Sequence, residues 1–188
     1  MARRPTVAYQ GAPGAYSHEA CLRLVPHDEP MAFEDFAAAI EAVVSGECEC
    51  ALLPVENNTA GKVPGVAEMI EAAGLHISAD AWLPIRHQLL AVPGASLGAI
   101  RTVRSHPMAL AQCGRTIGKL RLKAVEAFDT AGAAQELAES QDPTVAVIAS
   151  RAAAELYGLE ILRPNIEDDT GNATLFAIVS REARPDGR

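Results

Sequence analysis

The chain has few aromatic residues and no long apolar run. Aromatic side chains make up 4% of its 188 residues, so a core must be built from Ala, Val, Leu and Ile, which suits the buried parallel strands of an α/β protein. No apolar run approaches the roughly 18 residues that span a bilayer, and no signal-peptide pattern follows the first arginines. These absences predict a cytoplasmic α/β protein without a membrane partner.

A basic surface is also missing. The chain carries 16 Lys and Arg against 24 Asp and Glu, a net charge of −8, and its pI is about 5.1. This balance excludes the electrostatic footprint of a nucleic-acid partner. An anionic ligand would have to be attracted locally, by helix N-termini or single arginines, because the overall field repels it.

The cysteines do not have the spacing of a metal site. Cys48 and Cys50 form a Cys-Glu-Cys segment that is too tight for a zinc knuckle, and neither a second pair nor a nearby His completes it. Together with Cys21 and Cys113 they are predicted to be reduced thiols that pack as small apolar side chains. We therefore expect no metal.

What the chain does have is an alternation of strand and helix patterns. The expected strands are Thr6–Gln10, Glu49–Leu53, Leu75–Ala79, Ile85–Val92, Val103–Ser105, Lys123–Ala127, Val145–Ala149, Glu160–Leu162 and Thr174–Val179. Helical spacing predicts helices at Ser17–Leu24, Phe33–Ser45 and Val66–Ala73, and at "SHPMALAQC", "DTAGAAQELAE" and "SRAAAELYG". Ser17 and Ser105 are candidate N-caps.

This order predicts two α/β lobes, at about residues 5–82 plus 174–182 and about 84–165. The last strand has no following unit, so we expect it to return to the first lobe. Two connected lobes form a cleft, and ligands favour clefts and the carboxyl ends of parallel strands.

Two polar loops follow the first strands. In "YQGAPGAYS", the glycine turn before a helix is either an anion-binding device or a plain strand–helix turn. In "PVENNTAGKV", Glu56, Asn57, Asn58 and Thr59 are four consecutive hydrogen-bonding side chains after a buried strand. The second pattern is as consistent with ligand binding as with an ordinary turn.

Polar residues also stand at the later strand ends. Thr130 in "DTAGAA" is a helix cap or a carboxylate holder. His87 is a structural or a catalytic residue, and Arg86 beside it is a counter-ion for an acidic ligand. The Thr174 hydroxyl, between a loop and a strand, can donate a hydrogen bond to a leaving group.

Six segments, taken in order, resemble the catalytic domain of prephenate dehydratases. They are "YQGAPGAYSHEA", "LLPVENNTAGKV", "LPIRHQLL", "SHPMALAQC", "DTAGAA" and "NATLF", the last standing where the family has Asn-x-Thr-Arg-Phe. Each segment alone is weak evidence, but their joint order covers nearly the whole chain and is specific.

The resemblance implies an α/β fold, two-lobed and periplasmic-binding-protein-like (type II), with the active site in the cleft between the lobes. It implies a carbon–oxygen lyase that converts the dianion prephenate to phenylpyruvate in phenylalanine biosynthesis, without a cofactor or metal. It also implies that Thr174 is catalytic. The substrate-binding residues that it implies are Ser17, Glu56, Asn57, Asn58, Gly61, Arg86, His87, Thr130, Ala131, Asn172 and Phe176.

Three positions depart from the family pattern. Leu175 replaces the arginine of Thr-Arg-Phe and removes a charge that could balance a substrate carboxylate, for which Arg86 or Lys62 could compensate. Asn58 stands where many members have Ser, and Met108 where Gln is usual. The alternatives are a non-aromatising prephenate decarboxylase, whose members also lack the arginine, and a two-lobed binding protein without chemistry. The sequence does not distinguish prephenate from arogenate.

The resemblance also bears on domains and partners. Residues 1–188 are expected to be one dehydratase-like catalytic domain, and the residues after the last strand are too few for the regulatory ACT domain of most family members. Family precedent implies a homodimer or a higher homo-oligomer, whose partner molecule is the small dianionic substrate.

Overall fold

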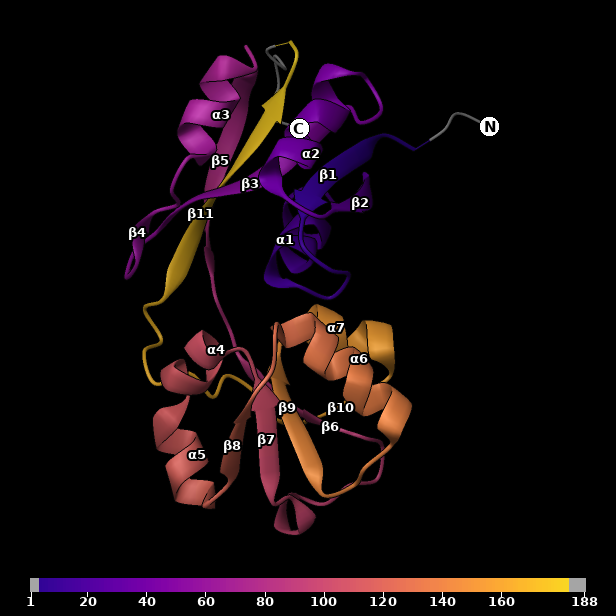
Figure 1. Cartoon of the computed structure of the whole chain (residues 1–188), viewed down its shortest axis with the longest axis vertical. Helices are drawn as coiled ribbons and strands as arrows, with labels where there is room; N and C mark the ends of the chain where they lie inside the picture. The colour runs from indigo at the N-terminus through magenta and orange to yellow at the C-terminus, as the bar shows by residue number, and fades with distance from the viewer. Residues whose placement is uncertain (1–3, 183–188) are drawn as a thin grey trace. The chain divides into compact units, whose positions relative to one another are not determined.

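The computed structural model describes residues 4–182 of the chain, which form two compact α/β units (Figure 1). Of these residues, unit 1 contains 4–12, 17–85 and 172–182, and unit 2 contains 13–16 and 86–171. The short segment 13–16 belongs to unit 2 although its neighbours on both sides belong to unit 1.

Unit 1 is built on one mixed sheet. Its elements are β1 (Thr6–Gln10), α1 (Tyr16–Leu24), β2 (Glu29–Phe33), α2 (Phe36–Val44), β3 (Cys50–Asn57), β4 (Gly61–Lys62), α3 (Val66–Ala72), β5 (His76–Pro84) and β11 (Ala173–Ser180). The strand order is β2-β1-β3-β11-β5, with β4 paired to β3. Strands β1, β2 and β3 are parallel, whereas β11 runs antiparallel to both of its neighbours. The last strand of the chain is therefore an interior strand.

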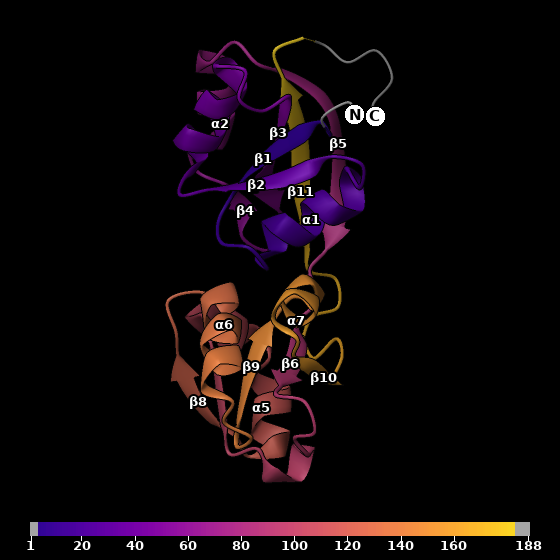
Figure 2. The ribbon, with the colours of Figure 1, turned by 90° about the vertical axis from the view of Figure 1, so that its right-hand side faces the viewer.

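Helices cover both faces of this sheet (Figure 2). On one face, apolar residues of α2 and α3 pack on β1, β3 and β11, as Ile40, Val66 and Leu53 illustrate. On the other face, Cys21 of α1 packs with Phe176 of β11. Because both faces are buried, β1 and β3 are nearly continuous apolar runs, as parallel strands usually are.

Unit 2 repeats this three-layer design. Its elements are β6 (Gln88–Ala91), η1 (Leu97–Ala99), β7 (Thr102–Ser105), α4 (Pro107–Gln112), α5 (Gly114–Leu120), β8 (Lys123–Glu126), α6 (Thr130–Ser140), β9 (Val145–Ala149), α7 (Arg151–Tyr157) and β10 (Glu160–Arg163). The strand order is β10-β6-β9-β7-β8. Residues of α4 and α5 pack on one face, and residues of α6 and α7 on the other.

The expected elements mostly exist, and the differences have local causes. Strand β2 was not predicted, because it is short, contains Pro30, and ends at Phe33, which was assigned to the predicted helix Phe33–Ser45. Helix α1 begins at Tyr16, so the prediction that Ser17 is its N-cap is wrong. The N-cap of α4 is His106, not Ser105, whose hydroxyl donates to the Ile148 carbonyl instead.

The proline of β3 does not end that strand. The sequence predicted an end at Pro54, but β3 continues to Asn57. The register against β11 shifts at this point, so that Pro54 lies opposite Phe176 and Glu56 opposite Leu175. A bulge accommodates a residue without a backbone N–H. Consequently, Glu56 and Asn57 lie on a strand and not in the predicted loop.

No helix within the described part of the chain combines the length and the apolar character that crossing a membrane requires. All four cysteines are buried and free, as predicted. The chain positions its polar site residues where β3 and β11 meet in unit 1 and around the start of β6 in unit 2.

Candidate functional site

The side chain of Asn57 organises a polar cluster in unit 1. Its Nδ2 group lies 2.9 Å from Asn172 Oδ1, 3.1 Å from the Ala173 carbonyl and 3.0 Å from Thr174 Oγ1. Its Oδ1 accepts from the backbone N–H groups of Thr59 and Ala60 and from the Thr59 hydroxyl at 2.6 Å. We call Asn57, Thr59, Asn172 and Thr174 the Asn57 group.

This arrangement determines how the Thr174 hydroxyl is used. An amide nitrogen can only donate, so Thr174 Oγ1 accepts from Asn57. The hydroxyl hydrogen of Thr174 remains, and Thr174 Oγ1 donates no hydrogen bond among residues 4–182. Thr174 is 9% exposed, so its surroundings are largely dry. The Asn57 group therefore holds one neutral hydrogen-bond donor that can be given to a ligand.

Strand register determines the neighbours of Leu175. This residue is paired with Glu56 on β3 and with Trp82 on β5. Glu56 is in turn opposite Lys62 on β4. An arginine in place of Leu175 would lie beside Glu56, because directly opposite side chains are about 5 Å apart. In this chain Lys62 is the cation in register with that carboxylate.

Asn58 has a backbone role. It is exposed, and its Oδ1 accepts from the Ala173 N–H at 2.9 Å while its own N–H donates to the Ala173 carbonyl at 3.0 Å. These two bonds join the end of β3 to the start of β11. The departure from Ser at this position thus preserves a side-chain oxygen that can accept.

In unit 2, His87 lies at the centre of a second cluster. The residue is 2% exposed. Its Nδ1 is hydrogen-bonded to the Tyr16 hydroxyl, and its Nε2 lies 2.7 Å from Gln112 Oε1. Since an amide oxygen only accepts, Nε2 carries the hydrogen and Nδ1 accepts from Tyr16. Both ring nitrogens are occupied, so His87 is built to position Tyr16 and Gln112.

A buried carboxylate anchors this histidine. Glu167 Oε2 accepts from the backbone N–H of His87 at 3.0 Å, and Glu167 Oε1 is 3.4 Å from the Arg86 guanidinium. Arg86 also donates to the Thr170 carbonyl at 2.9 Å. Burial lowers the pKa of His87, while the hydrogen bond to Gln112 and the charge of Glu167 raise it. We call Tyr16, Arg86, His87, Gln112 and Glu167 the His87 group.

The remaining predicted site residues lie outside these two groups. Thr130 is the first residue of α6, and the N-cap is Asp129, whose side chain accepts from Gly132. Ala131 and Phe176 are buried in their cores. Ser17 is a half-buried residue of α1, and Gly61 is exposed with a φ of 84° and open space around its α-carbon.

The glycine turn before α1 is a packing device. The Ser150 hydroxyl donates to the Gly14 carbonyl at 2.6 Å, and the Tyr157 hydroxyl donates to the Pro13 carbonyl at 2.9 Å. Gly14 has a φ of +89°, and a β-carbon there would come within 3.1 Å of Ala153. Close approach to α7 therefore explains this glycine, which favours the plain turn over an anion site.

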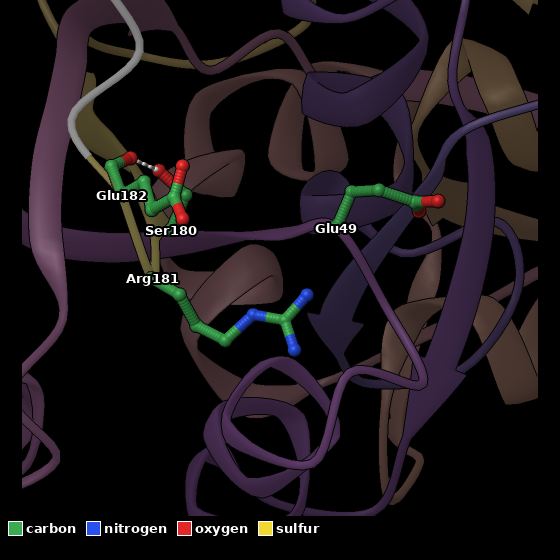
Figure 3. A pocket seen from close by; sticks show the side chains of 4 residues that line it. All are labelled: Glu49, Ser180, Arg181 and Glu182. Carbon is green, nitrogen blue, oxygen red and sulfur yellow. Dashed lines mark hydrogen bonds between the residues drawn. The ribbon is translucent and has the colours of Figure 1, made fainter.

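A hollow of about 500 Å³ lies in unit 1 at the other end of β11. Glu49, Ser180, Arg181 and Glu182 line it (Figure 3). Glu49 is engaged by the hydroxyl of Thr6 at 2.6 Å. None of the predicted site residues lines this hollow.

Three residues of the His87 group were not singled out from the sequence. Gln112 was inside a quoted motif, so its signal was available. Tyr16 was also inside a quoted motif, whereas Glu167 had no local signal, because its partner His87 lies 80 positions away in the chain. Only the folded arrangement identifies it.

Comparisons with known proteins agree with this fold and these motifs. Residues 7–184 match the family described as prephenate dehydratase. The chain is 43% identical to a bifunctional N-acyl-homoserine lactone acylase/prephenate dehydratase of Komagataeibacter europaeus, over 93% of this chain and 62% of that protein. It is 42% identical to arogenate dehydratase/prephenate dehydratase 1 of Arabidopsis thaliana, over 94% of this chain and 45% of that protein. The chain thus spans about half of these relatives.

Solved structures agree as well. Prephenate dehydratase from Arthrobacter aurescens, solved in complex with L-Phe, is 28% identical with a TM-score of 0.80, over 95% of this chain and 61% of that chain. The methionine-binding protein MetQ is 13% identical with a TM-score of 0.50, over 98% of this chain and 85% of the MetQ chain. At this identity the similarity concerns the fold alone. The predicted α/β, periplasmic-binding-protein-like fold class is confirmed, and the chain belongs to the prephenate dehydratase family.

Proposed function

We propose that this chain is a prephenate dehydratase that converts prephenate to phenylpyruvate, carbon dioxide and water. The observation that carries this proposal is the Thr174 hydroxyl, which accepts from Asn57 at 3.0 Å and keeps its own hydrogen for a ligand. Membership of the prephenate dehydratase family supports the choice of reaction.

The chemistry needs one neutral donor and correct positioning. Loss of the ring carboxylate as carbon dioxide supplies the electron pair that expels the ring hydroxyl, and a proton completes the departing water. Aromatisation drives the reaction, so the enzyme has to hold the dianion and stabilise charge on the leaving oxygen. A hydrogen bond from Thr174 stabilises the leaving oxygen without adding a charge. A hydroxyl is too weak an acid to transfer its proton unaided, so its role is to orient and to stabilise.

The two polar groups support different parts of this proposal. Substrate contact is assigned to Asn57, Asn172 and Thr174, together with Ser17, whereas Thr130 and the fully buried Ala131 support the start of α6. Glu56, Asn58, Gly61 and Phe176 support the strand ends that carry these contacts. His87 acts by holding Tyr16 and Gln112, because both of its ring nitrogens are occupied.

The test is a product assay. The purified protein is incubated with prephenate, phenylpyruvate is followed by its absorbance in alkali, and carbon dioxide is measured in parallel. Equal amounts of phenylpyruvate and carbon dioxide are expected. Binding of prephenate without either product would contradict the proposal and leave a two-unit binding protein.

Leu175 supports a second candidate, the non-aromatising decarboxylase. The chain lacks the family arginine next to Thr174, so one charge that could hold a substrate carboxylate is missing. Carbon dioxide released with a non-aromatic product in the same assay would establish this alternative and reject the first.

The names of the relatives add further substrates to the assay. Arogenate is included because the Arabidopsis relative is named for both substrates. An N-acyl-homoserine lactone is included because the Komagataeibacter relative is also named as an acylase. We propose prephenate as the preferred substrate, so turnover of it should exceed turnover of the other two.

We further propose that the protein is a cytoplasmic carbon–oxygen lyase, that it needs no cofactor or metal, and that it forms a homodimer or larger homo-oligomer. Light scattering after size-exclusion chromatography tests the oligomeric state. Unchanged turnover after dialysis against a chelator tests the independence from metals.

A further inference from the structure

Glu167 is a buried carboxylate outside the resemblance to the family motifs. Its side chain is 1% exposed. Its Oε1 is the buried side-chain oxygen that lacks a hydrogen-bond partner in the described part of the chain. Burying a charge is costly unless it is paired, so a carboxylate in this position needs a reason.

The neighbours of Glu167 supply that reason. Its Oε2 holds the backbone N–H of His87 at 3.0 Å, and its Oε1 faces the Arg86 guanidinium at 3.4 Å. The adjacent residue Ile166 donates its N–H to the His87 carbonyl at 2.9 Å. The segment before β11 is therefore hydrogen-bonded to both the backbone N–H and the backbone carbonyl of His87. The bond to the N–H depends on the Glu167 side chain.

The hydrogen bonds to the His87 backbone also fix the position of its ring. With its backbone fixed, the ring lies between the Tyr16 hydroxyl and Gln112 Oε1. Tyr16 begins α1, and Gln112 ends α4. A shift of the His87 backbone would therefore displace two side chains that come from distant parts of the sequence.

We propose that Glu167 is a positioning residue: its carboxylate fixes His87, and through His87 it orients Tyr16 and Gln112 for the reaction proposed above. The inference rests on that proposed function for its kinetic readout only. The state of the His87 ring can be measured without any substrate.

The charges around this carboxylate determine the sign of its effect on His87. Glu167 faces Arg86 and His87, and its neighbour Asp168 accepts from the Arg115 N–H at 3.0 Å. Burial, Asp168 and Glu167 raise the pKa of the Cys113 thiol to about 12, so this thiol stays neutral and does not interfere. The negative charge of Glu167 favours protonated His87. Removing that charge therefore makes protonation of His87 harder.

Two substitutions separate the hydrogen bond from the charge. Glu167→Gln keeps an oxygen that accepts from the His87 N–H but has no charge. Glu167→Ala removes both. Glu160→Gln is the matched control, because Glu160 also accepts a backbone N–H, from Gly94 at 3.1 Å, and lies on β10.

The experiment combines ring NMR and kinetics on the full chain. In NMR titrations of the histidine rings, Glu167→Gln should lower the pKa of His87, and Glu160→Gln should leave it unchanged. In prephenate turnover, Glu167→Ala should lower kcat about 100-fold with a smaller change in KM, the size expected when a positioned group is displaced by about 1 Å. Glu167→Gln should restore most of kcat and move the acidic limb of the pH profile to lower pH.

Two results would overturn the inference. One is an unchanged His87 titration in Glu167→Gln. The other is wild-type kcat in a folded Glu167→Ala protein, which would reduce Glu167 to a structural role. Failure of the proposed function is distinguishable, because then the wild-type chain does not turn over prephenate while the NMR titration still tests Glu167.

Discussion

The Asn57 group of unit 1 and the His87 group of unit 2 are both hydrogen-bonded networks, but they differ in charge and in what they leave unused. The Asn57 group contains only amides and hydroxyls and leaves one hydroxyl hydrogen, on Thr174, that is not donated among the described residues. The His87 group contains an ion pair whose carboxylate is buried, and it occupies both ring nitrogens of its histidine.

This difference indicates a division of work. A network with a spare donor can act on a ligand, whereas a network whose central ring is fully bonded holds geometry. Substitutions in the Asn57 group should therefore change turnover more than stability. Substitutions in the His87 group should change stability at least as much as turnover. The following predictions test this contrast.

The largest effect is expected for Asn57→Asp. The substitution keeps the shape but replaces the donating NH₂ group by an oxygen, which repels Asn172 Oδ1 and accepts the hydrogen of the Thr174 hydroxyl, so that this hydrogen is no longer available to a ligand. We expect kcat to fall about 1,000-fold, the upper range for loss of a positioned donor. Steady-state kinetics with prephenate measure this.

The matched control is Asn58→Asp. A carboxylate at residue 58 can still accept from the Ala173 N–H, so kcat should stay within a few-fold of wild type. Equal losses in the two variants would mean that added charge, and not the donor of Asn57, explains the effect.

The second prediction concerns stability and His87→Leu. The apolar side chain removes the hydrogen bonds that the His87 ring forms with the Tyr16 hydroxyl and with Gln112 Oε1. Because each intramolecular hydrogen bond contributes about 0.5–1.5 kcal/mol and both partners are half-buried, the free energy of unfolding should fall by about 2 kcal/mol. Denaturant unfolding measures this. If His87→Leu lowers the free energy of unfolding by less than Asn57→Asp does, the proposed difference between the two groups is contradicted.

The third prediction follows from the lowered pKa of His87. The unfolded histidine takes up a proton near its ordinary pKa of 6.5, but the buried ring resists protonation. The unfolded state then binds more protons, so the free energy of unfolding falls as the pH drops below about 6.5. Thermal unfolding between pH 7.5 and 5.5 should show this loss in the wild type and a smaller loss in His87→Asn.

His18 provides the comparison for that titration. Burial lowers its pKa too, so it contributes with the same sign. It is only half-buried, whereas His87 is 2% exposed. His18→Asn should therefore remove less of the pH dependence than His87→Asn, and the opposite order would refute the assignment to His87.

The smallest effect is expected for Leu175→Arg. The new guanidinium would lie opposite Glu56, which neutralises part of its charge. We expect KM for prephenate to fall about threefold, within the range of an exposed ion pair, with little change in stability. The control is Leu175→Met, which keeps the position apolar. An unchanged KM in Leu175→Arg would exclude a role of this position in substrate binding.

The sequence predicted the Asn57 group but not the complete His87 group. The Asn57 group comes from two local motifs at the end of β3 and at the start of β11, so consecutive polar residues at strand ends predicted it. The His87 group depends on Glu167 and Tyr16, whose partners are distant in the chain. A buried carboxylate that binds a backbone N–H leaves no periodic or motif signal.

Local chemistry explains the remaining differences in the fold. Strand β2 contains a proline and is only five residues long, and its pairing to β1 is what makes it a strand. Pro54 predicted a strand end, yet a bulge lets β3 pass through it and place Asn57 beside Asn172. The starts of α1 and α4 were misjudged by a residue because several neighbouring side chains could cap them. The start of α2 was misjudged by three residues, because Phe33 belongs to β2 and the N-cap is Asp35.

The most direct measurement is the kcat of Thr174→Val with prephenate, beside that of Thr174→Ser. Valine keeps the branched shape but has no hydroxyl, whereas serine keeps the hydroxyl. If Thr174 donates to the leaving oxygen, kcat falls about 100-fold in Thr174→Val with KM nearly unchanged, and Thr174→Ser retains most of the activity. A folded Thr174→Val protein with kcat within twofold of wild type would contradict the account.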